Sequence, residues 1–110
     1  MSINIDMVVE SNIDLFKSAL PEQKALALEA IGLVAEGHAK AECPVDTGRL
    51  RNSISHARDD DAAYIGTNVE YAPYVELGTS RMKARPFLRP AAEDYSMEYE
   101  ALVKSALTNE

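Results

Sequence analysis

The segment from Tyr71 to Ala91 constrains the fold most, because it carries three of the chain's five prolines and four of its eleven basic residues. Proline lacks a backbone N–H and pushes the residue before it out of the helical region. Pro86 and Pro90 flank Phe87-Leu88, so we expect this pair to be extended and to contribute a third strand. Proline is also favoured at the first position of a helix. The pattern therefore predicts a turn, a basic loop, an apolar pair and the start of a helix, which is typical of a segment that contacts a partner.

The turn at the beginning of this segment is predicted to pack on the core. Pro73 can begin a short helical turn, and Gly78 is placed to end it. Tyr71, Tyr74 and Val75 share one face of that turn by their i, i+3, i+4 spacing. Two tyrosines beside a basic loop could instead stack on nucleic-acid bases, but their spacing with a valine favours burial.

The basic loop follows the turn. Arg81, Lys83, Arg85 and Arg89 succeed one another without an acidic residue between them, in a chain whose formal net charge is −7. We hypothesise that this loop contacts an adjacent subunit or another partner in the assembly, because charges steer association while buried apolar anchors hold it. The residues predicted to make the contact are Arg81, Met82, Lys83, Arg85 and Phe87. The alternative is a surface loop whose Phe87 and Leu88 fill the chain's own core.

Composition limits the function classes. The net charge of −7 argues against a dedicated duplex-DNA binder, which needs a basic face to neutralise phosphates. The two ends of the chain are acidic and the middle is basic, which suits head-to-tail contact between copies, although pairing within one chain explains it too. Cys43 is the single cysteine, so no disulfide framework is expected, and this suits a reducing cytoplasm. We expect no signal peptide and no membrane span.

Hydrophobic periodicity predicts one α+β domain over residues 1–110, with a small antiparallel sheet packed against a long helix and a C-terminal helix. Residues 3–5 weakly suggest a strand, and residues 12–20 a short helix. The long helix is expected from Pro21 to Glu42, with a strand from the turn after Pro44 to about Arg58 and a partner strand over 63–68. The C-terminal helix is expected to begin at Pro90. The residues predicted to face the core from the long helix are Leu26, Ala30, Leu33, Val34, Gly37 and Ala41, and those from the C-terminal helix are Tyr95, Tyr99, Leu102, Val103, Ala106 and Leu107.

The triplet Asp46-Thr47-Gly48 is the one candidate for catalysis, because Asp-Thr-Gly is the active-site tripeptide of retroviral-type aspartic proteases. Two aspartates that share a proton need loops flanked by buried strands. Here the triplet follows a helix and a proline, and Arg49 would depress the aspartate pKa. We therefore predict a structural turn, in which Asp46 accepts backbone hydrogen bonds and Gly48 adopts a positive φ.

Other reactive residues form no recognised site. His38 and Cys43 lack metal-ligand spacing, and His56 has no evident nucleophile or acid beside it, although a cysteine–histidine pair stays open. Asp59-Asp60-Asp61 is predicted to be the polar connection of a hairpin; it could attract a divalent cation but lacks the calcium-loop pattern. No glycine-rich phosphate loop is present. We therefore expect no enzyme activity, no cofactor and no metal.

Three tracts, PVDTGRLRNSI, YAPYVELGT and ARPFLRPA, together resemble the neck or tail-completion proteins of long-tailed bacteriophages, also described as minor tail or head–tail joining proteins. The matching positions are Pro44, Asp46, Thr47, Gly48, Leu50, Arg51, Ser53, Ile54, Tyr71, Ala72, Val75, Glu76, Gly78, Thr79, Pro86, Phe87, Leu88, Pro90 and Ala91. The order and spacing of the tracts carry the resemblance over nearly the whole chain. The long helix departs from it, because members often carry lysine-rich helices and this helix is acidic.

The resemblance implies an α+β, non-enzymatic virion component, assembled in the host cytoplasm as a homo-oligomeric ring where the portal meets the tail. The implied partners are connector or stopper proteins and tail-tube or terminator proteins. DNA would pass through the ring without sequence-specific binding, and the acidic helices could line that channel repulsively. A tail terminator, a minor tail protein and a small DNA-associated adaptor protein are the alternatives.

Overall fold

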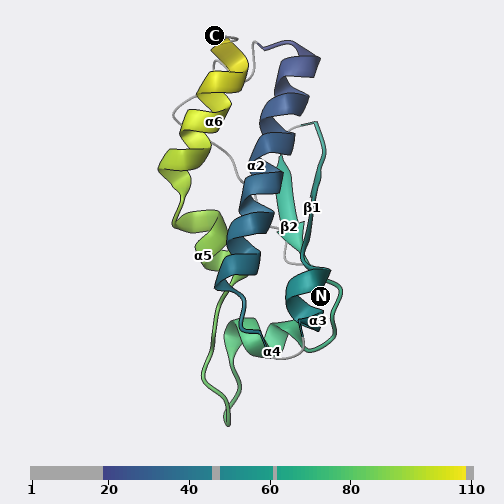
Figure 1. Cartoon of the computed structure of the whole chain (residues 1–110), viewed down its shortest axis with the longest axis vertical. Coiled ribbons are helices and arrows are strands. Elements are labelled where there is room, and N and C mark those ends of the chain that lie inside the picture. Colours follow the sequence, from purple (N-terminus) through teal and green to yellow (C-terminus); the bar gives the residue numbers. More distant parts are fainter. Residues whose placement is uncertain (1–18, 46–47, 61, 109–110) are drawn as a thin grey trace.

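The computed structural model describes residues 19–45, 48–60 and 62–108, which form an α+β domain (Figure 1). The described elements, in chain order, are α2 Pro21–Glu42, α3 Arg49–Ser53, β1 Ser55–Arg58, β2 Ala63–Gly66, α4 Ala72–Leu77, α5 Leu88–Glu93 and α6 Ser96–Thr108. The molecule is elongated, with extents of 48 × 20 × 19 Å. The fold class is as predicted. The strand expected over residues 3–5 and most of the helix expected over residues 12–20 lie outside the described residues.

Helix α2 forms the centre of the fold and has the predicted bounds. Pro21 occupies its first turn, and the backbone N–H of Leu20 donates to the side chain of Gln23 over 3.2 Å. The helix ends before Pro44, and Cys43 is already extended there. Figure 1 shows α2 lying in front of the two-stranded sheet with α6 along its side.

Most of the predicted buried face of α2 is wrong. Leu26 and Leu33 are 66% and 59% exposed, and Gly37 and Ala41 are exposed as well, whereas Val34 packs partly buried against the core. The face that packs on the core is a neighbouring one with the same helical spacing, made of Ala27, Leu28, Ile31, Gly32, Ala35 and Ala39. Both stripes are apolar, so periodicity alone could not choose between them. The small residues of the core-facing stripe let the sheet approach closely: a Cβ added at Gly32 would lie 2.8 Å from Cδ2 of His56 on β1.

The tract after Pro44 was predicted as a strand but begins as helix α3. Gly48 precedes it with φ 87°, the positive value predicted for this glycine, and its carbonyl accepts the first helical hydrogen bond from the Asn52 N–H over 2.9 Å. The alternation of apolar residues was misleading, because in one short helical turn Leu50 and Ile54 lie on one side and both are buried. The strand therefore starts only at Ser55. Asp46 and Thr47 lie outside the described residues.

The hairpin itself is confirmed. Strands β1 and β2 are antiparallel, with Ser55 opposite Gly66 and Arg58 opposite Ala63. Asp59 closes the connection, since its side chain accepts from the Ala62 N–H over 2.8 Å and from the Tyr64 hydroxyl over 2.8 Å. Ala63 and Ile65 of β2 are buried against α2, which fixes the face that the sheet presents to the core.

The expected third strand near Phe87 is wrong: within the described residues the sheet has two strands. Leu88 instead begins α5, and Pro90 lies in the first turn of that helix, where a missing N–H costs nothing. The C-terminal helix also starts earlier than predicted and is interrupted at residues 94–95 before α6. The predicted stripe is confirmed: on α6, Tyr99, Val103 and Leu107 are buried and Leu102 and Ala106 are partly buried, and Tyr95, just before α6, also packs partly buried against the core.

Candidate assembly contact

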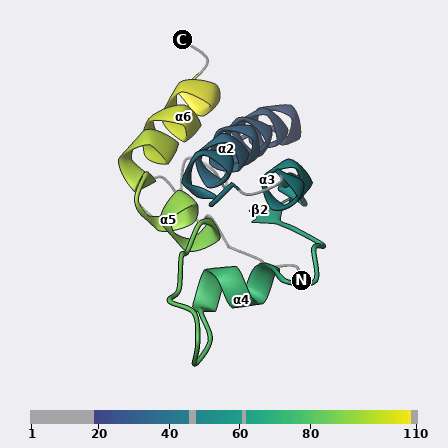
Figure 2. The same cartoon turned by 60° about the horizontal axis from the view of Figure 1, so that its bottom comes forward.

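The basic loop of residues 78–86 connects α4 to α5 and projects from one end of the long axis (Figure 1). Turning that end forward shows the loop beyond α4 and α5, clear of α2 and α6 (Figure 2). The loop is not held by its sequence neighbours alone. Three sets of contacts fix its beginning, its tip and its end.

Gly78 fixes the beginning. It ends α4, as predicted, with its N–H donating to the Tyr74 carbonyl over 2.9 Å and with φ 77°. A Cβ on this glycine would lie 2.7 Å from the backbone nitrogen of Ala84 and 3.0 Å from its Cα. Both the left-handed conformation and the close return of the chain therefore require glycine here.

Backbone hydrogen bonds order the tip. The Thr79 N–H donates to the Met82 carbonyl over 2.8 Å, and the Met82 N–H donates back over 3.4 Å. The Thr79 hydroxyl also accepts from the Arg81 N–H over 3.2 Å. Further along, the Arg85 N–H donates to the Val75 carbonyl of α4 over 2.8 Å. The tip is thus a tight turn on a narrow base, beyond the end of α4.

Glu76 fixes the end of the loop. Its side chain is 5% exposed, and its Oε1 accepts from the N–H groups of Phe87 and Leu88 over 3.1 and 2.9 Å. Its Oε2 accepts from the Arg89 N–H over 3.3 Å. The carboxylate therefore satisfies N–H groups at the start of α5 that have no partner within that helix. Sequence reasoning missed this role; the signal was an acidic residue among apolar neighbours on a short helix, ahead of a proline-flanked helix start.

Phe87 and Leu88 sit beside that carboxylate with 0% exposure. Phe87 therefore lies in the chain's own core in this structure, and the expectation that it anchors a neighbouring subunit is corrected. The position follows from the Glu76 contacts, which turn residues 87–89 inward. Of the predicted contact residues, the structure leaves Arg81, Met82, Lys83 and Arg85 exposed.

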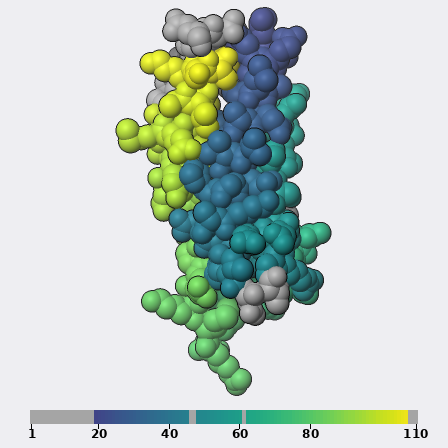
Figure 3. All heavy atoms as spheres, viewed as in Figure 1, coloured from purple at the N-terminus to yellow at the C-terminus, as the bar shows by residue number. Residues whose placement is uncertain are grey.

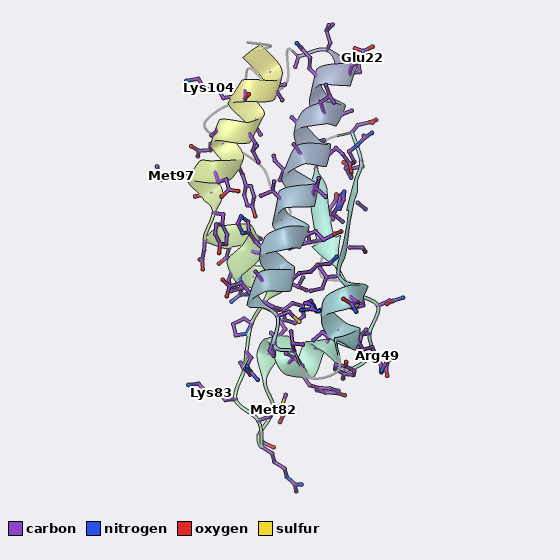
Figure 4. All side chains as sticks on the ribbon, viewed as in Figure 1. Glu22, Arg49, Met82, Lys83, Met97 and Lys104 are labelled. Carbon is purple, nitrogen blue, oxygen red and sulfur yellow. The ribbon has the colours of Figure 1, made fainter. Side chains whose placement is uncertain are left out.

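The exposed part of the loop combines charge with apolar surface. Figure 4 shows Lys83 on the loop, pointing away from the body. Met82 faces the pocket described below and is 41% exposed. Leu77, at the end of α4, is 67% exposed. Within residues 19–45, 48–60 and 62–108, no ion pair joins Arg81 or Lys83 to a carboxylate. Charges on this loop are therefore available to a partner.

A pocket of about 570 Å³ lies beside the loop, between α3 and α4. The structure thereby brings Gly48 of the predicted turn next to Met82 and Arg85 of the predicted loop. Arg49, at the pocket's rim, donates two hydrogen bonds to Glu70 over 3.1 and 2.9 Å, and these hydrogen bonds raise its pKa. The lining residues are Pro44, Val45, Gly48, Arg49, Leu50, Tyr71, Val75, Met82 and Arg85.

Tyr74 does not lie where it was predicted. Its side chain is 58% exposed, whereas Tyr71 and Val75 pack partly buried against the core. The short helix has room to bury only one side, and Ala72 and Glu76 occupy the most buried positions on it. Tyr74 is consequently a surface residue on the same helix from which the loop departs.

His56 lies in a second charged cluster, on the flank of the molecule. Its Nε2 and Nδ1 lie 2.6 Å from Glu29 and 3.0 Å from Glu36, both on α2. The hydrogen bond to Glu29, followed by that to Glu36, outweighs burial and raises the His56 pKa. The hydrogen bond with His56 lowers the pKa of Glu29. Burial would raise the pKa of Glu36, but hydrogen bonds from His56 and Lys40 outweigh it, so that this pKa is lowered too. Sequence reasoning missed these partners because they are 20 and 27 residues away.

The remaining candidates for chemistry have other contacts. Cys43 is 5% exposed, burial raises the pKa of its thiol, and that thiol lies 3.4 Å from the Pro44 carbonyl. His38 stacks on Tyr95 at 3.6 Å and contacts Glu98 over 3.1 Å. The described residues contain no group of three or more potential metal ligands. No described helix is long and apolar enough to cross a membrane.

A small α+β domain with an ordered, exposed basic loop fits the class of phage structural proteins indicated by the three sequence tracts. A comparison with known families matches residues 9–78 to the HK97-gp10-like family, described as "Bacteriophage HK97-gp10, putative tail-component". The match covers more than half of the chain, and the chain belongs to this family of phage tail components. The match includes the first tract and all but the last residue of the second, and it ends where the basic loop begins. Searches of curated proteins and of solved structures gave no match.

Proposed function

We propose that this protein is a non-enzymatic virion component that forms a homo-oligomeric ring at the head–tail junction. In this proposal it assembles in the host cytoplasm, joins the connector or stopper to the tail tube or terminator, and lets DNA pass without sequence-specific binding. Membership of a tail-component family supports the general role. The observation that supports a ring in particular is the 78–86 loop.

The geometry of that loop suits contact between subunits. Its ends are held by Gly78 and by the Glu76 hydrogen bonds, so little conformational entropy would be lost when its tip is bound. The tip stands at one end of an elongated molecule. A contact between one end of a subunit and a different surface of the next is heterologous, and such contacts generate rings when the rotation closes. The pocket beside the loop would add area to the same contact.

The test replaces Arg81, Lys83 and Arg85 together by Ser and measures infectious particles and the amount of the protein in purified virions. The matched control replaces Arg51, Arg58 and Lys104 by Ser, which removes the same charge from exposed positions elsewhere. We expect the loop variant to lose incorporation and infectivity while the control retains both. Undiminished infectious particles from the loop variant would reject the loop as the assembly contact.

A DNA-associated adaptor is the second candidate, and the exposure of Tyr74 beside the loop favours it, because exposed aromatics next to cations can stack on bases. Binding of single-stranded or duplex DNA by the isolated chain, falling steeply as salt rises, would support this candidate. Electron microscopy of the protein co-expressed with neighbouring structural proteins separates the two, and also separates a neck ring from a tail terminator or minor tail position. The same map tests whether the acidic faces of α2 and α6 line the DNA channel; a lumen lined only by neutral or basic groups would reject that idea.

A further inference from the structure

Helix α2 has a second apolar stripe that the described part of the chain does not cover. It consists of Leu26, Ala30, Leu33, Gly37 and Ala41, which lie on one face by helical spacing. The two leucines are 66% and 59% exposed, and a Cβ added at Gly37 would meet no atom within 4 Å. Figure 3 shows α2 as an open strip of surface between α6 and the β1 side of the molecule. Leu26 and Leu33 are the largest side chains on this strip, which we call the outer stripe.

Acidic residues border the outer stripe on its β1 side. Glu22, Glu29 and Glu36 lie on the adjacent row of α2, and the latter two contact His56 of β1. Glu22 is exposed in the first turn. The outer stripe therefore presents two exposed leucines beside a row of carboxylates.

The basic loop has the complementary chemistry. It offers Met82, 41% exposed, with Arg81 and Lys83 on either side of it in the sequence, and Leu77 is 67% exposed at its base. Apolar surface would meet apolar surface, and cations would meet carboxylates. Complementary charges of this kind fix register and speed association, while burial of the leucines and the methionine would supply affinity.

The tip of the loop lies away from the two leucines of its own chain's outer stripe. It projects beyond the Glu42 end of α2 (Figure 1), whereas Leu33 and Leu26 lie about 14 and 24 Å back along that helix at 1.5 Å per residue. Because the loop lies at one end of the subunit and the outer stripe on its flank, each subunit can use its loop to bind one neighbour while its outer stripe binds the loop of another. That is the arrangement a head-to-tail ring needs.

We propose that the outer stripe of α2 binds residues 79–85 of the basic loop of a neighbouring copy of this chain. The inference rests on the proposed ring and goes beyond it by naming the receiving surface. It also explains why the sequence pattern of α2 contains two apolar faces: one packs the core and the other is covered only on assembly.

Disulfide cross-linking in assembled particles tests the proposal. A chain that carries both L33C and M82C cannot close the bridge within itself if the loop stays at its end, because bridged Cα atoms must lie within about 7 Å. Mild oxidation of particles should then give a ladder of dimers, trimers and higher multimers on a non-reducing gel. The two single-cysteine variants should give no ladder. Cys43 can stay, since it is buried.

The matched control pairs M82C with M97C. Met97 is 83% exposed on the outer side of α6 (Figure 4) and lies away from the outer stripe. A ladder from L33C with M82C, and none from M97C with M82C, supports the proposal. Particles that contain the protein but give no ladder from L33C with M82C, or give one equally from the control, overturn the interface and leave the ring intact. Absence of the wild-type protein from particles overturns the interface and the proposed function together.

A second measurement does not depend on cysteine chemistry. Leu26 and Leu33 are exposed, so replacing both by Ser should lower the urea midpoint of the isolated chain only slightly, through the weaker helix propensity of Ser, while incorporation into particles falls at least as far as in the loop variant. Wild-type incorporation of a normally folded L26S/L33S variant would refute the proposal.

Discussion

Removal of the Glu76 carboxylate should destabilise the fold far more than removal of any surface acid. This side chain is 5% exposed and accepts three backbone hydrogen bonds from residues 87–89. Glu76→Ala would leave the N–H groups of Phe87 and Leu88 buried without acceptors. Each such group costs about 1–3 kcal/mol, so we expect a loss of about 3–5 kcal/mol, a large share of the about 5–15 kcal/mol typical of a domain.

Glu76→Gln separates the charge of the side chain from its shape. The amide keeps one acceptor oxygen, but its bonds to N–H groups become neutral, and hydrogen bonds to charged groups are stronger by about 1 kcal/mol each. We therefore expect a loss of about 2 kcal/mol, between the wild type and the alanine variant. Glu93→Ala is the matched control on α5, because Glu93 is 67% exposed and lies 3.8 Å from Arg89. A surface pair of this kind contributes at most about 0.5 kcal/mol.

Urea unfolding followed by circular dichroism gives these free energies for the isolated chain. Residue-level amide exchange should also show lost protection at Phe87 and Leu88 in the alanine variant. A Glu76→Ala protein that folds and loses less than about 1 kcal/mol would refute the reasoning. So would a Gln variant that is as unstable as the Ala variant while Glu93→Ala is unchanged, since the retained shape and amide oxygen would then contribute nothing.

Two further predictions concern the contact between α2 and β1. Gly32→Ala should destabilise the fold by about 1–2 kcal/mol in urea unfolding, because its Cβ would lie 2.8 Å from Cδ2 of His56. Gly37→Ala on the same helix is the control: its Cβ meets nothing within 4 Å, and it should stabilise the fold by up to about 1 kcal/mol. Equal effects of the two substitutions would contradict the packing argument. The raised pKa of His56 means that its contribution is fully present below its ordinary value of 6.5 and is lost as the pH rises through the folded-state pKa. Stability of the wild type should therefore fall over this range relative to that of His56→Gln, and parallel pH profiles would show that the contacts to Glu29 and Glu36 do not matter.

The sequence by itself determined the elements whose signals are local. Pro21 and Pro44 bounded α2, Gly78 ended α4, and Asp59 closed the hairpin, because each acts on the backbone within a few residues of itself. The α+β class followed from the order of these elements. The order and spacing of three tracts were enough for the family, which an independent comparison bears out.

Only the tertiary structure decided what depends on distant partners. Helix α2 carries two apolar stripes of similar character, and the one that packs is the one whose small residues, Gly32 above all, admit β1. The three N–H groups of residues 87–89 turned inward to Glu76, so Phe87 went into the core and the expected third strand became a helix start. Burial is a property of the assembled chain, and a pattern of apolar residues shows which faces can be buried but not which of them will be.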